Sequence, residues 1–230
     1  MSEIIGNAAY FGVTVSLAGY AVGLWVKKKV NKPFANPLLI AILLVMASLL
    51  LLRVDYDIYN ESAKYLSYLL TPATVCLAIP LYQQLTLLKK HWKAVVGGLT
   101  AGAASSLVSV WGLSALFRLT HEQYVSLLPK SITTAIGMGL SEELGGIVTL
   151  TVASIILTGV LGAVIGEAVC KLFRIRDRVA VGLAFGASAH AVGTSRALEI
   201  GEVEGAMSSL AIAVSGLITV AAASFFVGLY

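Results

Sequence analysis

Long uncharged stretches alternate along the chain with short clusters of charged residues. A helix needs about 20 apolar residues to cross the hydrocarbon core of a membrane, and several stretches reach that length. We predict spans at 8–26, 33–52, 65–88, 94–117, 147–166 and 205–230. The span at 65–88 contains Pro72 and Pro80. Since proline interrupts an α-helix, this span is predicted to be kinked or broken.

Three basic clusters orient these spans. They lie at 27–32, 89–93 and 171–178. Cytoplasmic loops of membrane proteins carry such clusters. With all three clusters in the cytoplasm, the N- and C-termini are both predicted to be extracytoplasmic, in a multi-pass protein of the inner (plasma) membrane.

Two shorter apolar stretches, 131–141 and 179–195, do not fit this alternation as full spans. The first lies between two spans whose facing ends are both extracytoplasmic, and the second starts and ends on the cytoplasmic side. We therefore predict both to be re-entrant or broken helices. Non-helical backbone at membrane depth is tolerated only where protein or a water-filled cavity surrounds it, so both stretches indicate a substrate path.

The sequence also repeats itself at an offset of 56 residues. Residues 116–145 align without a gap on 172–201 and share nine identities over 30 positions, including Glu143 with Glu199. Each copy holds the end of a span and a re-entrant stretch, and the predicted orientations are opposite. Inverted repeats whose broken helices meet near the midplane are typical of secondary transporters. Compositional bias is the alternative explanation. A weaker echo of 127–134 occurs at 69–74.

The predicted fold is thus an all-α integral membrane protein with about six full transmembrane helices, two re-entrant or broken helices and an inverted internal repeat. We divide the chain into five parts. These are a transmembrane helix with a basic loop (1–35), two transmembrane segments of which the second is Pro-interrupted (36–93), the first inverted repeat (94–146), the second inverted repeat (147–204) and a C-terminal transmembrane helix (205–230).

Composition narrows the class of protein further. Hydrophobic residues make up 58% of the chain and charged residues 12%, against roughly a quarter charged in soluble domains. A soluble globule, a nucleic-acid binder and a disordered chain are therefore disfavoured, and the lipid bilayer is the expected surrounding. The two cysteines have neither a disulfide nor a metal-ligand spacing. We see no P-loop and no nucleophile elbow, so we expect no metal, no cofactor and no enzymatic activity.

The first re-entrant stretch begins with a run of hydroxyl residues, Ser131, Thr133 and Thr134, directly after Lys130. Exposed amide groups at a helix start favour an anion, and hydroxyl groups can donate to it. The alternative is that these side chains only cap the helix or bond neighbouring helices. In the second copy, small residues around Ser188 would let backbone amides approach a ligand.

Two ionisable residues in the second copy are the clearest single candidates. His190 lies in an otherwise uncharged stretch, and ionisable groups at membrane depth tend to mark substrate or proton pathways. The alternative is a structural histidine with satisfied hydrogen bonds. Arg196 can hold a carboxylate, or it pairs with Glu199 or Glu202 one helical turn away.

The predicted substrate-binding residues are Ser131, Thr133, Thr134, Ser188, His190, Thr194 and Arg196. The residues predicted to support them are Lys130, Glu143, Glu199, Thr71 and Thr74. For the repeated pair Glu143 and Glu199, a structural role such as capping or pairing with a cation is favoured.

The stretch GLAFGASAHAVGTSRALEIGEVEGA at 182–206 resembles the LrgB/CidB family, as do KSITT at 130–134 and LAIPLY at 77–82. The resemblance extends from Asn36 onward. One departure is Ala135, where the family often has proline, and it leaves the break point of the first re-entrant helix open. The resemblance implies antiholin-like action with a small LrgA/CidA-type holin-like partner on murein hydrolases and cell lysis. Relatives include a plastidal glycolate/glycerate translocator, and bacterial pairs have been linked to pyruvate uptake.

These implications agree with a site for a small carboxylate. The leading hypothesis is a secondary transporter for monocarboxylates of the pyruvate, glycolate or glycerate class. The alternative is an antiholin-like regulator that acts through protein contacts and transports nothing. A membrane-embedded hydrolase is disfavoured, because no convincing nucleophile and base are spaced for it. Glycines in the span at 94–117 permit close helix packing, either internally or in a homo-oligomer.

Overall fold

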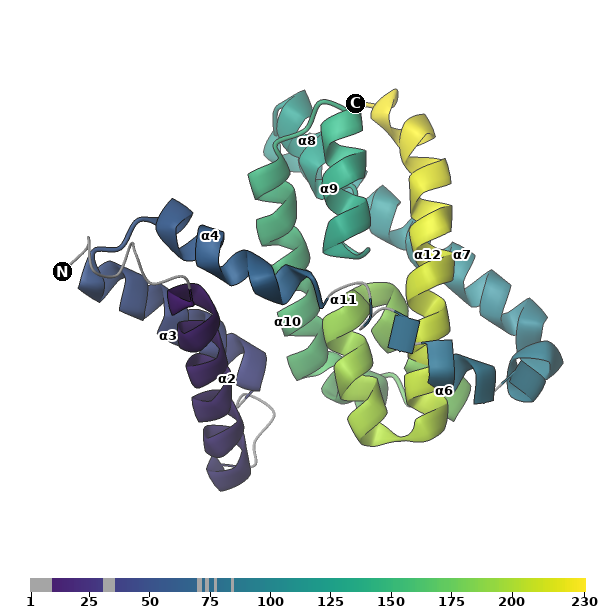
Figure 1. The fold of residues 1–230 in the computed structure, drawn as a ribbon. Helices are drawn as coiled ribbons and strands as arrows, with labels where there is room; N and C mark the ends of the chain where they lie inside the picture. The colour runs from purple at the N-terminus through teal and green to yellow at the C-terminus, as the bar shows by residue number, and fades with distance from the viewer. Residues whose placement is uncertain (1–9, 31–35, 70–71, 73–74, 77, 84) are drawn as a thin grey trace. The chain divides into compact units, whose positions relative to one another are not determined.

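The computed structural model describes residues 10–30, 36–69, 72, 75–76, 78–83 and 85–230. The chain divides into two compact units, residues 1–76 and 77–230. All regular secondary structure among the described residues is helical (Figure 1). The predicted all-α class is therefore confirmed.

The first unit contains three helices, α2 (Phe11–Val30), α3 (Pro37–Leu52) and α4 (Tyr56–Ser67). Helix α2 packs against both of the others. Glycine allows the close approach to α4, because a Cβ at Gly12 would lie 2.5 Å from the Tyr59 carbonyl oxygen. The Gly12 amide donates to the Ser62 hydroxyl at 2.7 Å. Asn36 and Asp55 accept backbone hydrogen bonds as N-caps of α3 and α4, as short polar side chains do at helix starts.

The second unit contains every residue of the site described below. Its helices are α6 (Ala78–Gln83), α7 (Leu85–Phe117), α8 (His121–Leu127), α9 (Thr134–Glu143), α10 (Val148–Leu172), α11 (Arg178–Ile200) and α12 (Glu202–Val227). Helix α12 packs against α11 and α7, and α10 packs against α11 and α9 (Figure 1).

Within the described residues, three helical segments are long and apolar enough to cross a membrane. They are Lys89–Phe117 within α7, Val148–Leu172 and Glu202–Val227. They correspond to the predicted spans at 94–117, 147–166 and 205–230, and they make this chain a membrane protein. Helix α3 is apolar but has only 16 residues. The count of six spans stays a prediction.

The predicted span at 65–88 is interrupted in the structure. Helix α4 ends at Ser67 within this stretch, and Tyr68 and Leu69 form a turn. Helix α7 is itself kinked at His91, where φ is −112° and ψ is 15°.

Helix α11 doubles back on itself at His190, where φ is 42° and ψ is −133°. A straight helix of its 23 residues would separate its ends by about 34 Å. Instead, Arg178 at its start donates to both carboxylate oxygens of Glu204, just beyond its end, at 2.9 and 3.0 Å. This ion pair, in which Arg178 is exposed and Glu204 is buried, also holds the pKa of Arg178 above its ordinary value, chiefly through the side-chain hydrogen bond. The predicted broken helix at 179–195 is therefore a helical hairpin.

The two arms of this hairpin are in direct contact. The carbonyl oxygen of Phe185 lies 2.5 Å from the position that a Cβ would take at Gly193. Residues eight apart in a continuous helix are separated by about 12 Å. The arms therefore pack on one another beside the break, and a glycine is needed at the contact.

Helices α8 and α9 form a second, shorter hairpin around residues 128–133. A buried hydroxyl cluster ties its two arms to α10. The Thr151 hydroxyl lies 2.9 Å from the Ser126 carbonyl oxygen and 2.7 Å from the Ser141 hydroxyl. The Ile147 amide donates to the Ser126 hydroxyl at 2.7 Å.

Thr151→Val is expected to lower the free energy of unfolding by about 1–3 kcal/mol, because it leaves buried partners of the hydroxyl without a hydrogen bond. The matched control is Thr149→Val, two residues away at an exposed position of the same helix. This variant should change the free energy of unfolding by about 0.5 kcal/mol or less. Reversible unfolding in mixed detergent micelles measures both. Equal losses in the two variants would show that the cluster does not hold the hairpin.

The aligned copies at 116–145 and 172–201 share a backbone conformation at their first polar residue. Arg118 and Arg174 have φ values of 53° and 57°. Each follows the end of a long helix, and the next amide bonds back to a carbonyl five residues earlier, Leu119 to Ser114 at 3.0 Å and Ile175 to Cys170 at 2.8 Å. This is a Schellman-type helix end. Both copies then continue into a hairpin, while their opposite membrane orientation stays a prediction.

Candidate binding pocket

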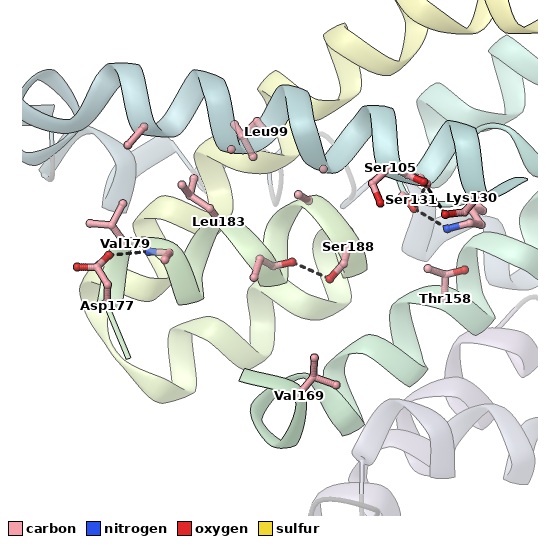
Figure 2. A pocket seen from close by; sticks show the side chains of 18 of the residues that line it. Leu99, Ser105, Lys130, Ser131, Thr158, Val169, Asp177, Val179, Leu183 and Ser188 are labelled. Atoms are coloured by element: carbon pink, nitrogen blue, oxygen red, sulfur yellow. Dashed lines mark hydrogen bonds between the residues drawn. The ribbon is translucent and has the colours of Figure 1, made fainter. Parts of the chain in front are cut away.

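A pocket of about 860 Å³ lies along α7, between the two hairpins. Its walls come from α7, the first arm of α11, α10 and the tip of the α8–α9 hairpin. Asp177 lies at one end of the pocket, and Lys130 and Ser131 lie at the other (Figure 2). All lining residues belong to the second unit.

The Lys130 end of the pocket carries several polar side chains. The Lys130 amine lies 3.1 Å from the Ser131 hydroxyl, which lies 3.0 Å from the hydroxyl of Ser106 on α7. Ser105 and Ser109 line the same wall. This end therefore offers an amine and several hydroxyl groups to a ligand.

The Ser106 contact also shows how deep the hairpin tip reaches. Ser106 is 17 residues from Lys89 and 11 from Phe117, the ends of the α7 segment that is able to cross a membrane. It therefore lies within about 5 Å of that segment's midpoint. The tip of the α8–α9 hairpin thus contacts α7 near mid-span.

The tip of α11 reaches the same part of α7. The Cβ of Ala187 lies 3.9 Å from the position that a Cβ would take at Gly102, one helical turn from Ser106. The next residue, Ser188, lines the pocket, and its hydroxyl donates to the Ala184 carbonyl at 2.6 Å. The two hairpin tips therefore converge near the middle of α7.

Of the predicted binding and supporting residues, Ser131, Ser188 and Lys130 line this pocket. His190 does not. Its side chain is buried, with 4% of its surface exposed, and its Nε2 lies 2.9 Å from the Ile155 carbonyl oxygen. The imidazole contacts Gly159 of α10, where a Cβ would collide with it. In the structure His190 marks the break of α11 and attaches it to α10.

Thr194 and Arg196 make contacts outside the pocket. The buried Thr194 hydroxyl lies 2.7 Å from the Ser208 hydroxyl and donates to the His190 carbonyl at 3.0 Å. The Arg196 guanidinium is bonded to both Glu167 and Glu199. The structure therefore shows the second of the two alternatives for Arg196, an ion pair with Glu199 one helical turn away. Glu167 on α10 is an additional partner.

The remaining predicted residues lie at helix ends or outside the described part. Thr133 is the N-cap of α9, whose first residue is Thr134, and Glu143 is exposed at its end. Thr71 and Thr74 fall outside the described residues. The binding role of each of these residues stays a prediction.

Several pocket residues were not singled out by the sequence. They are His91, Ser105, Ser106, Ser109, Thr158 and Asp177. For the pocket residues on α7, the sequence does carry a pattern that could have indicated them. Gly98, Gly102, Ser105 and Ser109 recur at intervals of three and four residues, which places them on one face of a helix, and this face borders the pocket.

The contacts of His190 predict that its side chain stabilises the α11 hairpin and does not bind the ligand. His190→Ala should cost about 1–3 kcal/mol of unfolding free energy, because it removes a buried hydrogen bond. His190→Gly should be about 1 kcal/mol more stable than His190→Ala, since glycine adopts a positive φ without strain. In folded protein, carboxylate affinity should stay unchanged in both variants. A clear loss of affinity in folded His190→Gly would instead support the predicted binding role.

Comparison with known proteins gives one consistent result. The model of the LrgB-like family matches residues 16–229. The "Antiholin-like protein LrgB" of Bacillus subtilis (strain 168) is 37% identical over 221 residues, which cover 96% of both proteins. No solved structure is significantly similar to this chain.

Proposed function

This chain belongs to the LrgB-like family, and we propose that it carries small monocarboxylates of the pyruvate, glycolate or glycerate class across a membrane. The observation that carries the proposal is the position of Lys130. Its amine lies at one end of a pocket, near the middle of a helix that is able to span the membrane. The substrate-contacting groups are Lys130, Ser131 and Ser188.

The charges around Lys130 support an anionic ligand. Among the described residues, no carboxylate oxygen lies within 4.0 Å of its amine. The carboxylates of Glu167, Glu199 and Glu204 form ion pairs with basic residues other than Lys130. A partly buried cation is costly without a counter-charge. A bound carboxylate supplies that charge and accepts hydrogen bonds from the neighbouring hydroxyl groups, which suits the geometry of this end of the pocket.

The arrangement of the hairpins supports transport. Broken helices whose ends meet near the midplane form the substrate sites of many secondary transporters. Here two hairpin tips contact α7 one turn apart, at Gly102 and Ser106. Movement of one hairpin relative to α7 would change which end of the pocket is open.

The test is uptake of labelled pyruvate, glycolate or glycerate by liposomes that contain the purified protein. We expect uptake well above that of protein-free liposomes, with the label released by excess unlabelled acid. Because the family resemblance implies a small LrgA/CidA-type holin-like partner, the assay is run with and without that protein. Absence of uptake by folded protein under both conditions contradicts the proposal.

A second function is supported more directly by the comparisons. The relative's name contains "Antiholin-like", and we propose on this basis that the chain also regulates murein hydrolases and cell lysis in the inner (plasma) membrane, together with the holin-like partner. A Lys130→Gln variant separates the two functions. Lysis control that survives loss of uptake points to protein contacts, whereas joint loss shows that lysis control follows from transport.

A further inference from the structure

Lys130 is isolated from other charges along the membrane-spanning helices around it. In α7 no charged residue occurs between Lys93 and Arg118, and α10 carries none before Glu167. Helix α12 carries none after Glu204. The α8–α9 hairpin carries Glu122, Glu142 and Glu143, all exposed at the ends of their helices and away from the tip.

The titratable groups of α11 and the start of α7 are engaged elsewhere or lie at the other end of the pocket. His190 is bonded to Ile155 and does not line the pocket. Asp177 lines the pocket at the end opposite Lys130, where its carboxylate accepts the Ala180 amide at 2.9 Å (Figure 2). His91 also lines the pocket, at the start of α7, 15 residues before Ser106. That separation along the helix is about 22 Å.

The surroundings of Lys130 in an empty pocket therefore disfavour the charged form of its amine. Burial disfavours the charged form of a lysine, and an ionised group at membrane depth is costly. The neutral amine keeps its hydrogen bond with the Ser131 hydroxyl. A carboxylate that binds beside it reverses the preference, because a nearby opposite charge favours the ammonium form.

We infer that Lys130 couples the binding of each carboxylate to the uptake of one proton, an inference that rests on the proposed function. The anion binds as the carboxylate, the Lys130 amine takes up one proton from the buffered solution, and an ammonium–carboxylate pair results. The charge at the Lys130 end of the pocket is then zero before and after binding. The loaded carrier therefore moves one acid anion and one proton together, without moving net charge.

This coupling has a definite pH dependence. Above the pKa of the amine in the empty pocket, carboxylate affinity should fall about tenfold for each pH unit, since one proton is bound with each anion. Below that pKa the affinity should become constant. Arginine stays protonated at all of these pH values, so Lys130→Arg should bind the acid with an affinity that does not vary with pH.

The experiment is calorimetric titration of the purified protein with pyruvate between pH 5.5 and 8.5. Two buffers with different enthalpies of ionisation are used at each pH, so that the number of protons taken up can be calculated. We expect about one proton for each pyruvate in the wild type at the higher pH values. We expect none in Lys130→Arg and an unchanged value in the control Lys171→Arg, whose side chain is 81% exposed.

The outcomes separate this inference from the proposed function. If the wild type binds pyruvate without taking up a proton, the inference is overturned and the proposed carrier function remains. This outcome is decided by the wild type alone, without any variant. Proton uptake that persists in folded Lys130→Arg also overturns it, and His91→Gln then tests the other end of the pocket. Absence of both pyruvate binding and pyruvate uptake at every pH overturns the proposed function itself.

Discussion

Gly98→Leu is expected to reduce monocarboxylate uptake at least about tenfold, a loss of about 1.4 kcal/mol in transition-state stabilisation. Gly98 lines the pocket on α7, and a Cβ at this position would have no atom within 4 Å. The added isobutyl group therefore enters open space in the pocket instead of displacing the protein. It narrows the path between Asp177 and Lys130 without removing a polar group that binds the acid.

The adjacent residue provides a matched control. A Cβ at Gly97 also has no atom within 4 Å, but Gly97 does not line the pocket. Gly97→Leu should therefore retain uptake to within about twofold, which corresponds to a change of well under about 1 kcal/mol in transition-state stabilisation. Liposome uptake assays measure both variants at equal amounts of incorporated protein. Equal loss in both variants would indicate a general disturbance of α7, and full activity in both would show that the substrate does not use this pocket.

Gly186→Ala is expected to cause the largest loss of stability, about 3 kcal/mol. Gly186 lies where the first arm of α11 meets α12. A Cβ there would collide with the backbone carbonyl oxygen of Ser208 and would lie 2.7 Å from the Cβ of Ala211. Because the obstacle is backbone and not the end of a flexible side chain, the two helices must separate to admit a methyl group.

The control for this substitution is Gly112→Ala on α7, where a Cβ has no atom within 4 Å. Alanine has the higher helix propensity, so this variant should gain about 0.5–1 kcal/mol. Unfolding in mixed micelles, followed by circular dichroism, gives both values. A wild-type-like Gly186→Ala would show that α11 and α12 do not pack as closely as the structure indicates.

The convergence of two hairpin tips on α7 connects the pocket to both proposed functions. Lys130 and Ser131 lie at the turn of the α8–α9 hairpin, whose two arms are joined to α10 by the Thr151 cluster. Ser188 reaches it because α11 turns back at His190. On the proposed functions, a ligand between the tips would contact both hairpins and stabilise their present arrangement. A partner protein that shifted either hairpin would alter the same pocket.

The sequence by itself determined the class of protein and the positions of its main elements. Uncharged stretches of sufficient length predicted the three helices that are able to span a membrane, because the cost of placing charges in lipid excludes them from such segments. Charge placement alone predicted that 179–195 does not cross as a simple span, and the structure shows a hairpin there. The motif at 182–206 was specific enough to indicate the family that the comparisons show.

Only the tertiary structure decided which polar residues share the pocket. The side chain of His190 is directed by a single positive φ, and this angle places it against Ile155 instead of in the pocket. Arg196 is paired with Glu167, which is 29 residues away in the chain. Ser106, within an ordinary apolar span, meets Ser131 because a hairpin tip lies beside it. Hydrophobic patterning reports which face or segment is buried, but partners across a helical break depend on backbone angles and packing between distant segments.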